Sequence, residues 1–299
     1  MGGPRGNTDD PRPRIASLVP SLTELLVELG LGDRIVARTR YCIHPAGRVA
    51  AIPVVGGTKD VDLARLQALA PTHVVVNVDE NRREIVDALQ AWPLAPEVLV
   101  TRPTDPRDNL ALVDGFAQVF AAEAGVAEQA AHWRVRLEAA LDATRPHGRA
   151  PRRVLYLIWR RPWMTVARDT YISRLLGRVA WSTLPAVEGG DAGAARYPSL
   201  AGDEPWLAQV DEVLLSSEPY PFGERHVAQA RALCPGARVR IVDGERLSWY
   251  GTRAVAGLDY LRHLAADAGG AEAGGAEAGA ETGDARTGGD NRTWTSSSR

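Results

Sequence analysis

One long helix near the middle of the chain constrains the fold more than any other feature of the sequence. Residues 126–144 read VAEQAAHWRVRLEAALDAT. Apolar residues recur along this stretch at three- and four-residue steps, namely Val126, Ala130, Trp133, Leu137 and Leu141. This spacing is typical of a helix with one apolar stripe, and Arg134 and Glu138 can pair on its exposed side. About 19 residues at 1.5 Å each give a rod of roughly 30 Å, the width of a small domain. We expect this rod to join two lobes.

The sequence before this helix alternates between short apolar strands and amphipathic helices. The predicted strands cover residues 15–19, 35–37, 73–78 and 97–100. Ser21, followed three residues later by Glu24, has the pattern of a capping box at the start of the first helix, and Gly30 is expected to end that helix. Strands of continuous β-branched residues between amphipathic helices are typical of a mostly parallel sheet covered on both faces.

The sequence after the long helix repeats the same order of elements. A strand is predicted at residues 153–158, and Asp169 is the expected N-cap of the helix that follows it. Residues 205–234 can then be laid over residues 63–91 as short helix, buried strand, acidic turn and helix. A final helix is expected from residue 252 to about residue 266. This repetition indicates an internal duplication of an α/β unit.

The predicted fold class is therefore α/β, with two similar lobes of mostly parallel strands joined by one long backbone helix. The expected divisions are a disordered N-terminus at 1–13, a first lobe at 14–125, the linker helix at 126–146, a second lobe at 147–266 and a disordered tail at 267–299. The tail is expected to be disordered because it contains almost no large apolar residue that a core could bury.

Composition and charge exclude several kinds of protein. A formal net charge of -2 gives no general reason to bind nucleic acid or acidic lipid. No stretch approaches 18 consecutive apolar residues, so no membrane span is predicted. Cys42 and Cys234 match no metal-ligand spacing, and Cys42 is expected to behave as a small buried hydrophobe. Lys59 is the only lysine among 35 basic residues, so a single arginine is weak evidence of function.

The beginning of the sequence bears on where the protein works. The first 14 residues contain no apolar core of a signal peptide, and no cysteine follows that could carry a lipid. As written, the chain is expected to be cytoplasmic. It would be extracytoplasmic if the start of the sequence is truncated.

Loops at the carboxyl ends of the strands carry the candidate ligand-binding residues, because ligands of open α/β sheets bind there. In the first lobe these are Tyr41, His44, Gly57, Thr58, Asn77 and Glu80. In the second lobe they are Trp159, Arg160, Arg161, Trp163, Tyr171, Glu218, Tyr220, Phe222, Trp249, Tyr250 and Arg253. Aromatic walls of this kind suit a large planar or hydrophobic-shelled ligand. No residue is assigned as catalytic or as a direct metal ligand.

Several of these residues have a purely structural interpretation. Tryptophan at the end of a strand often closes a core, and His44 before a proline can simply shape a turn. Glu218 could face Asp79 as a carboxylate pair, or it could cap the helix that begins GERHVAQ. His226, on that helix, is expected to be solvated. Motifs of common hydrolases, zinc proteases and phosphate-binding loops are not found.

With these segments identified, the chain resembles the helical-backbone periplasmic binding proteins, which serve ABC importers of cobalamin and ferric siderophores. The resemblance lies in IASLVPSLTELLVELG, VVGGTKDVDLARLQALAPTHVVVNVDENRREIVDAL, LYLIWRRPWMTVARDTYISRLLG, SSEPYPFGERH and LSWYGTR, and it covers residues 14–266. It implies two α/β lobes joined by a long helix, with a cobalt or iron chelate held between them. It implies no enzymatic activity and no covalently bound cofactor.

The resemblance also implies an ABC permease dimer as a partner. Many family members dock through one glutamate on each lobe. In this sequence Ala64 stands where the first glutamate is expected, and Asp203 or Glu204 could supply the second.

Two other functions remain open from the sequence. One is an enzyme that handles tetrapyrroles, such as a chelatase, because those enzymes also use two similar α/β lobes. The other is a cytoplasmic ligand sensor that has lost its role in transport.

Overall fold

Two four-stranded parallel sheets form the framework of the computed structural model, which describes residues 12–146 and 148–277. The first sheet contains β1 (Ile15–Ser17), β2 (Ile35–Arg38), β3 (His73–Asn77) and β4 (Glu97–Thr101). The second contains β5 (Arg152–Leu157), β7 (Trp181–Thr183), β9 (Glu212–Ser216) and β10 (Arg238–Val242). The strand orders are β2-β1-β3-β4 and β7-β5-β9-β10, which are equivalent when each sheet is numbered along the chain. This agreement supports the predicted duplication, and the predicted fold class is confirmed.

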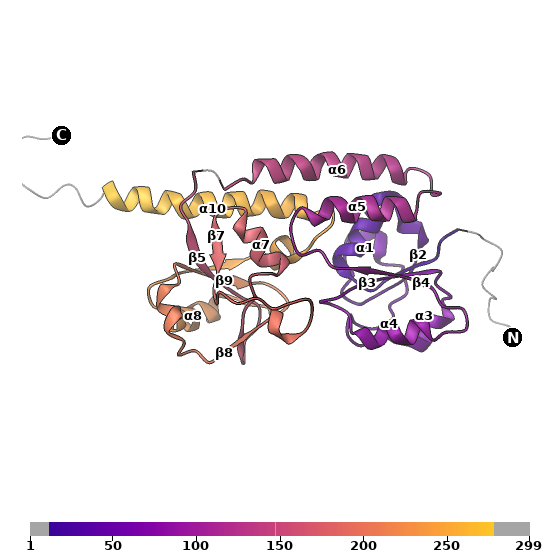
Figure 1. The fold of residues 1–299 in the computed structure, drawn as a ribbon, viewed down its shortest axis with the longest axis horizontal. Coiled ribbons are helices and arrows are strands. Elements are labelled where there is room, and N and C mark those ends of the chain that lie inside the picture. The colour runs from indigo at the N-terminus through magenta and orange to yellow at the C-terminus, as the bar shows by residue number, and fades with distance from the viewer. Residues whose placement is uncertain (1–11, 147, 278–299) are drawn as a thin grey trace, which may run out of the picture.

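The long predicted helix is present as α6 (Val126–Ala143). It begins after Gly125, which has a φ of 83°, and the hydroxyl of Thr144 donates to the carbonyl of Ala140 at its end (2.8 Å). Arg134 and Glu138 pair at 3.2 Å, as expected. In Figure 1, α6 lies over α5 (Asp108–Val119) and over α10 (Arg253–Glu277), which comes from the far end of the chain.

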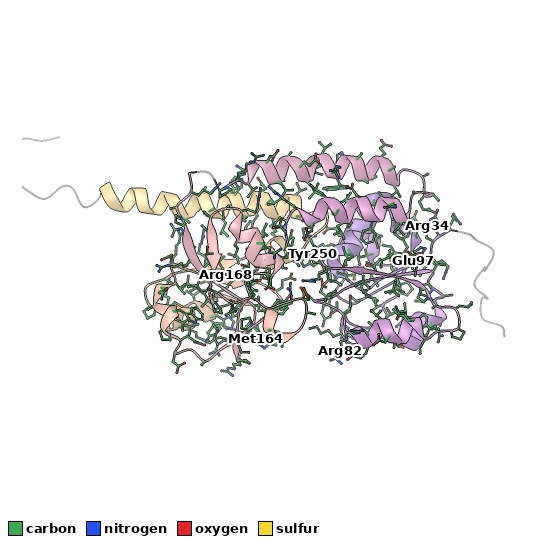
Figure 2. The ribbon with its side chains drawn as sticks, in the orientation of Figure 1. Arg34, Arg82, Glu97, Met164, Arg168 and Tyr250 are labelled. Carbon is green, nitrogen blue, oxygen red and sulfur yellow. The ribbon has the colours of Figure 1, made fainter. Side chains whose placement is uncertain are left out.

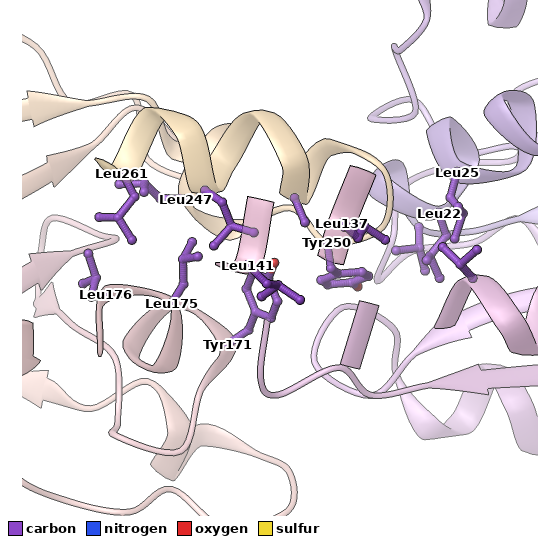
Figure 3. Packing of buried hydrophobic residues seen from close by; sticks show 14 of the residues in the cluster. Leu22, Leu25, Leu137, Leu141, Tyr171, Leu175, Leu176, Leu247, Tyr250 and Leu261 are labelled. Carbon is purple, nitrogen blue, oxygen red and sulfur yellow. The ribbon is translucent and has the colours of Figure 1, made fainter. Parts of the chain in front are cut away.

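A single apolar cluster continues from one lobe to the other beneath α6 and α10. It contains Leu22 and Leu25 of the first lobe, Leu137 of α6, and Tyr171 and Leu261 of the second lobe. Figure 3 shows these side chains as one layer that crosses between the lobes. Burying one leucine side chain stabilises a fold by about 1.5–3 kcal/mol, so separating the lobes would expose a large part of the core.

The opposite face of each sheet packs against its own set of helices. In the first lobe α3 (Leu63–Ala68) and α4 (Arg83–Gln90) lie on this face, and in the second lobe α8 (Val227–Leu233) does so. Alternate residues of each strand point to the two faces, so that in β5 Val154 joins the shared cluster while Leu155 joins the local one. Burial on both faces explains the continuous apolar runs in β3, β5 and β9.

Shorter elements complete the two lobes. In the first lobe they are α1 (Pro20–Leu26), a π-helical turn (Val27–Leu31), a 3₁₀ turn (Gly32–Arg34) and α2 (Ala46–Val49). In the second they are α7 (Tyr171–Gly177), α9 (Gly244–Ser248), the antiparallel pair β6 (Trp163–Met164) and β8 (Ser199–Leu200), and 3₁₀ turns at Ala194–Arg196, Pro205–Gln209 and Glu224–His226. Gly30, with a φ of 85°, interrupts the helical turns after α1, as expected.

Two predicted helix caps are wrong. α1 begins at Pro20 with Val19 as its N-cap, so Ser21 lies inside the helix, and Glu24 binds Arg253 of α10 instead of closing a capping box.

The N-cap of α7 is Thr170, whose hydroxyl accepts from the Ser173 amide. The neighbouring Asp169 instead accepts from the amides of Gly189 and Gly190 at 2.8 Å each. In both cases the carboxylate accepts hydrogen bonds from residues distant in sequence.

The end of the last helix also differs from the prediction. α10 continues to Glu277 instead of ending near residue 266. This part of the chain contains alanine and glutamate, which are strong helix formers. The expected disorder of residues 1–11 and 278–299 concerns residues outside those that the structure describes. Over the described ranges, every helix is too short or too polar to cross a bilayer.

The shared cluster predicts that α6 contributes strongly to stability. Leu137→Ala should lower the free energy of unfolding by about 2–5 kcal/mol, because it removes buried methyl groups and leaves a cavity. Val135→Ala is the matched control on the same helix, since Val135 is 66% exposed. Urea denaturation followed by circular dichroism measures both. A loss in the Leu137 variant no larger than in the control would contradict the structural role assigned to α6.

Candidate functional site at the interlobe interface

The strand-end loops of the two lobes meet at a surface that we call the interlobe interface. It comprises residues 39–44, 56–60, 77–81 and 101–105 of the first lobe and residues 158–163, 184–198, 216–222 and 243–253 of the second. Arg196, whose side chain is fully buried, provides one link across it. Its guanidinium binds both carboxylate oxygens of Asp79, at 2.8 and 3.0 Å, and donates to the carbonyl of Gly190. Arg102 and Asp191 form a second, exposed ion pair across the same interface.

Two buried asparagines hold the loop that carries Asp79 and Glu80. The side-chain oxygen of Asn77 accepts from the Asp79 amide, and its amide group donates to Thr101. Asn81 accepts from the backbone of Asn77 and donates to the carbonyls of Leu18 and Thr58. Asn77 therefore positions the loop that carries Asp79 and Glu80. Thr58 is linked to the same loop through its backbone carbonyl.

Glu80 reaches across the interface to the second lobe. The Tyr250 hydroxyl donates to Glu80 Oε1 at 2.6 Å, and Tyr250 lies between the two lobes in Figure 2. Burial raises the pKa of Glu80 to about 7, the Tyr250 hydrogen bond opposes this effect, and the charge of Glu218 adds to it. The charge of Glu218 therefore acts on Glu80 across the interface.

Glu218 is held by neutral donors of its own lobe. Its Oε1 accepts from the Ser248 hydroxyl at 2.9 Å and from the Trp249 indole N–H at 2.7 Å. Burial is the main cause of its raised pKa. The backbone at Gly244 passes so close to Glu218 that a Cβ there would collide with it, which explains the glycine.

Both sequence interpretations of Glu218 are thereby corrected. It does not cap the helix that begins GERHVAQ, because its side chain is bound by Ser248 and Trp249. Asp79 is not its partner in a carboxylate pair, because Asp79 is neutralised by Arg196. The charge of Glu218 raises the pKa of Glu80, whereas the charges of Glu245 and Asp243 raise the pKa of Glu218.

Arg253 joins the lobes on the side of the interface nearest α10. Its guanidinium binds both oxygens of Glu24, at 2.6 and 2.9 Å, and one oxygen of Glu245 at 2.8 Å. His44 Nε2 lies 3.1 Å from the same Glu245 carboxylate, and its ring meets the edge of Trp249 with centroids 5.6 Å apart. Arg253 and His44 are thus engaged in holding the lobes together.

The predicted aromatic residues separate into two groups. Tyr41 and Trp159 are 53% and 41% exposed, one on each lobe, and Trp159 meets the partly buried Tyr220 edge to face at 5.5 Å. The others are buried in the lobes, namely Trp163, Tyr171, Phe222, Trp249 and Tyr250. They pack on each other, as in the stacked pair of Trp163 and Phe222 at 6.0 Å. The exposed aromatic surface is therefore smaller than the sequence suggested.

Close packing around Gly57 fixes the position of the exposed Tyr41. A Cβ at Gly57 would lie 3.2 Å from the Tyr41 ring and would collide with the Asp60 carboxylate. Gly57 therefore allows the Tyr41 ring and the Asp60 carboxylate to approach this loop closely.

The two neighbouring arginines at the end of β5 differ in their surroundings. Arg160 donates to Gln229 at 2.9 Å and stacks over Trp163, with its guanidinium carbon 4.2 Å from the ring centroid. Arg161 is exposed and has a φ of 70°, which is rare for a residue with a side chain.

Two smaller expectations have opposite outcomes. Cys42 is fully buried beside Thr39, so its interpretation as a small hydrophobe is confirmed, and burial raises its thiol pKa. The prediction that His226 is solvated is wrong. His226 is buried, its Nδ1 accepts from the Gly223 amide, and its Nε2 lies 3.2 Å from the Tyr220 hydroxyl.

Two residues that organise the interface were missed in the sequence. Arg196 lies in a glycine- and alanine-rich loop of an arginine-rich chain, where no pattern marks it. Asn109 is buried at the start of α5, where it donates to the Tyr171 hydroxyl and accepts from the Gly251 amide at 2.6 Å. The only signal for Asn109 was a polar side chain before an apolar helical run.

Two hollow surfaces are lined by none of the predicted aromatic residues. A groove of about 590 Å³ runs between the edge strand β4 and α5, and a pocket of about 190 Å³ lies between α1, α6 and α10. Within residues 12–146 and 148–277, no three histidine, cysteine or acidic side chains converge as a metal-binding group.

Several solved structures share this architecture. The periplasmic vitamin B12 binding protein of Vibrio cholerae matches with a TM-score of 0.69 at 18% identity, covering 84% of this chain and 97% of that chain. The periplasmic heme-binding protein of Vibrio cholerae matches with a TM-score of 0.66 at 21% identity, with coverages of 84% and 98%. The heme complex of IsdE from S. aureus gives 0.66 at 16% identity, with coverages of 85% and 99%. At these identities the likeness establishes the fold.

The family assignment comes from the sequence itself. No curated protein matches the chain at a significant level. The family model described as periplasmic binding protein matches residues 15–192, which is more than half of the chain. The chain therefore belongs to the periplasmic binding protein family.

Proposed function

We propose that this protein is a receptor that holds a metal chelate, either a cobalamin-type corrinoid or a ferric siderophore, at the interlobe interface. The observation that carries the proposal is that the strand-end loops of each lobe present one exposed aromatic ring, Tyr41 or Trp159, and one partly exposed carboxylate, Glu80 or Glu218. Rings and polar groups that converge from two lobes are the usual lining of a small-molecule site. The similar folds of a vitamin B12 binding protein and a heme-binding protein support a chelate as the ligand.

The candidate residues take different parts in this proposal. Tyr41, Trp159 and Tyr220 would supply contact area, and Thr58, Glu80, Glu218 and Arg161 would supply polar contacts. Asn77, Gly57, Tyr171 and the buried aromatic rings would support these side chains. His44, Arg160 and Arg253 would act through the ion pairs and hydrogen bonds that hold the two walls in place.

The alternative of a chelatase-like enzyme receives no support from the comparisons, since the family and the similar structures are solute-binding proteins. The alternative of a cytoplasmic sensor likewise receives none. Proteins of this kind hand a chelate to an ABC permease, and we propose the same partner here. We also propose an extracytoplasmic place of action, because the family is periplasmic.

The residues available for docking to a permease differ from the family pattern of one glutamate on each lobe. Ala64 is exposed on α3, so this position offers no carboxylate. Glu204 accepts from the amides of Ala201 and Gly202 at 2.7 and 2.9 Å, which fixes it within its own loop. Asp203 is exposed, and it is the better candidate for the acidic contact on the second lobe.

Titration calorimetry with corrinoids, haemin and ferric siderophores tests the receptor proposal directly. For the ligand that binds, Tyr41→Ala and Trp159→Ala should each weaken binding by about tenfold, because each removes an exposed ring worth about 0.5–1.5 kcal/mol beyond its burial. Leu94→Ala is the control, since Leu94 is 90% exposed and lies outside the interlobe interface. Unchanged affinity in both aromatic variants would place the ligand elsewhere.

Small-angle scattering with and without ligand tests how far the lobes move. The shared cluster and the links made by Arg196 and Arg253 should restrict the motion to a small hinge rotation. We therefore expect nearly superimposable scattering curves. A closure of many degrees on ligand binding would contradict this expectation.

A further inference from the structure

Two carboxylates at the interlobe interface differ from the other acidic groups around them. Tyr250 is the hydrogen-bond donor to Glu80, and Ser248 and Trp249 are the donors to Glu218. All three donors are neutral. Both carboxylates remain partly exposed, so a ligand can reach them.

Five neighbouring acidic groups, by contrast, are paired with cations. Asp79 binds Arg196, Asp191 binds Arg102, and Asp60 binds Arg40. Glu24 and Glu245 share Arg253. These pairs also engage the arginines, so that Arg253, Arg196 and Arg102 cannot serve an anionic ligand without breaking a contact that joins the lobes.

The charges that face the two carboxylates do not neutralise them. Glu80 is influenced by Glu218, Asp79, Tyr250 and the exposed Lys59, and the effect of Lys59 is the smallest of these. Glu218 is influenced by Glu245 and Asp243, which are also acidic. Glu80 also acts on the phenol of Tyr197. Among the charged groups that act on Glu80 and Glu218, the acidic ones outweigh the single lysine, so the potential at these two carboxylates is negative.

From this arrangement we infer that the receptor selects chelates without net negative charge, and that Glu80 and Glu218 together bind a cationic or N–H-bearing part of the ligand. The inference rests on the proposed function and specifies its ligand class. A carboxylate-bearing chelate would meet two like charges in a partly buried site, whereas an amide or ammonium group would donate hydrogen bonds to them. Amide-rich corrinoids and cationic or neutral ferric hydroxamates fit this chemistry, and ferric triscatecholates and haem with free propionates do not.

Matched ligands that share one chelate core test the inference. The pairs are cyanocobalamin and its monocarboxylate derivative, haemin diamide and haemin, and a ferric trihydroxamate whose terminal amine is free or succinylated. For the core that binds, the amide or amine form should bind at least about tenfold more tightly than the carboxylate form, a difference of about 1.4 kcal/mol. Glu80→Gln combined with Glu218→Gln should reduce this ratio towards one, because glutamine keeps the hydrogen-bonding shape and removes the charge.

Two control variants distinguish the site from a general effect of charge. Glu84→Gln and Glu224→Gln make the same chemical change at exposed positions, one in each lobe, and should leave the ratio unchanged. Thermal melting checks that all variants fold. Because the pKa of Glu80 is about 7, binding of the amine form should strengthen as the pH rises through that value, and it should not do so in Glu80→Gln.

The possible results distinguish failure of this inference from failure of the proposed receptor function. If a chelate binds but its carboxylate form binds as well as its amide form, or if the double variant keeps the ratio, the inference is wrong and the receptor function stands. If no chelate of any core binds, both are wrong.

Discussion

The apolar cluster shared by the two lobes determines how the rest of the molecule is arranged. It contains residues from both sheets, from α6 and from α10, so neither lobe has a complete core on this side without the other. An independent lobe would leave the inner faces of α6 and α10 in water, at a cost of about 25 cal/mol for each Å² of apolar surface. The separation and orientation of the two sets of strand-end loops follow from this packing.

Polar links at the interlobe interface act within the frame that the cluster provides. Arg196 and Asp79, Arg253 and Glu24, and Tyr250 and Glu80 each join residues more than a hundred positions apart in the sequence. Partly buried ion pairs add little net stability, but the loss of one partner leaves a charge without compensation. Their role is therefore to fix which loops face each other, and this gives the interface a defined shape.

Local patterns were sufficient to predict the framework, because they depend on residues close together in sequence. The stripe of Leu137 and Leu141 identified α6, and the β-branched run 74–76 identified β3. The errors occurred where a distant partner decides the outcome. Glu24 binds Arg253, and His226 is enclosed by Tyr220 and Phe222, which neither spacing nor composition reveals. The aromatic candidates were placed at the correct strand ends, but only packing decides which rings stay exposed.

The character of the candidate site depends on which charges lack a charged partner, and not on how many charges the loops contain. Arginine is abundant in these loops, which at first favours an anionic ligand. In the structure the arginines at positions 102, 196 and 253 are bound by carboxylates, while Glu80 and Glu218 receive hydrogen bonds from neutral groups. A charge already paired in a partly buried network contributes little to an approaching ligand, because its field is cancelled by its partner at short range. The two carboxylates with neutral donors therefore determine the charge of the part of the interface that they occupy, although the loops are rich in arginine.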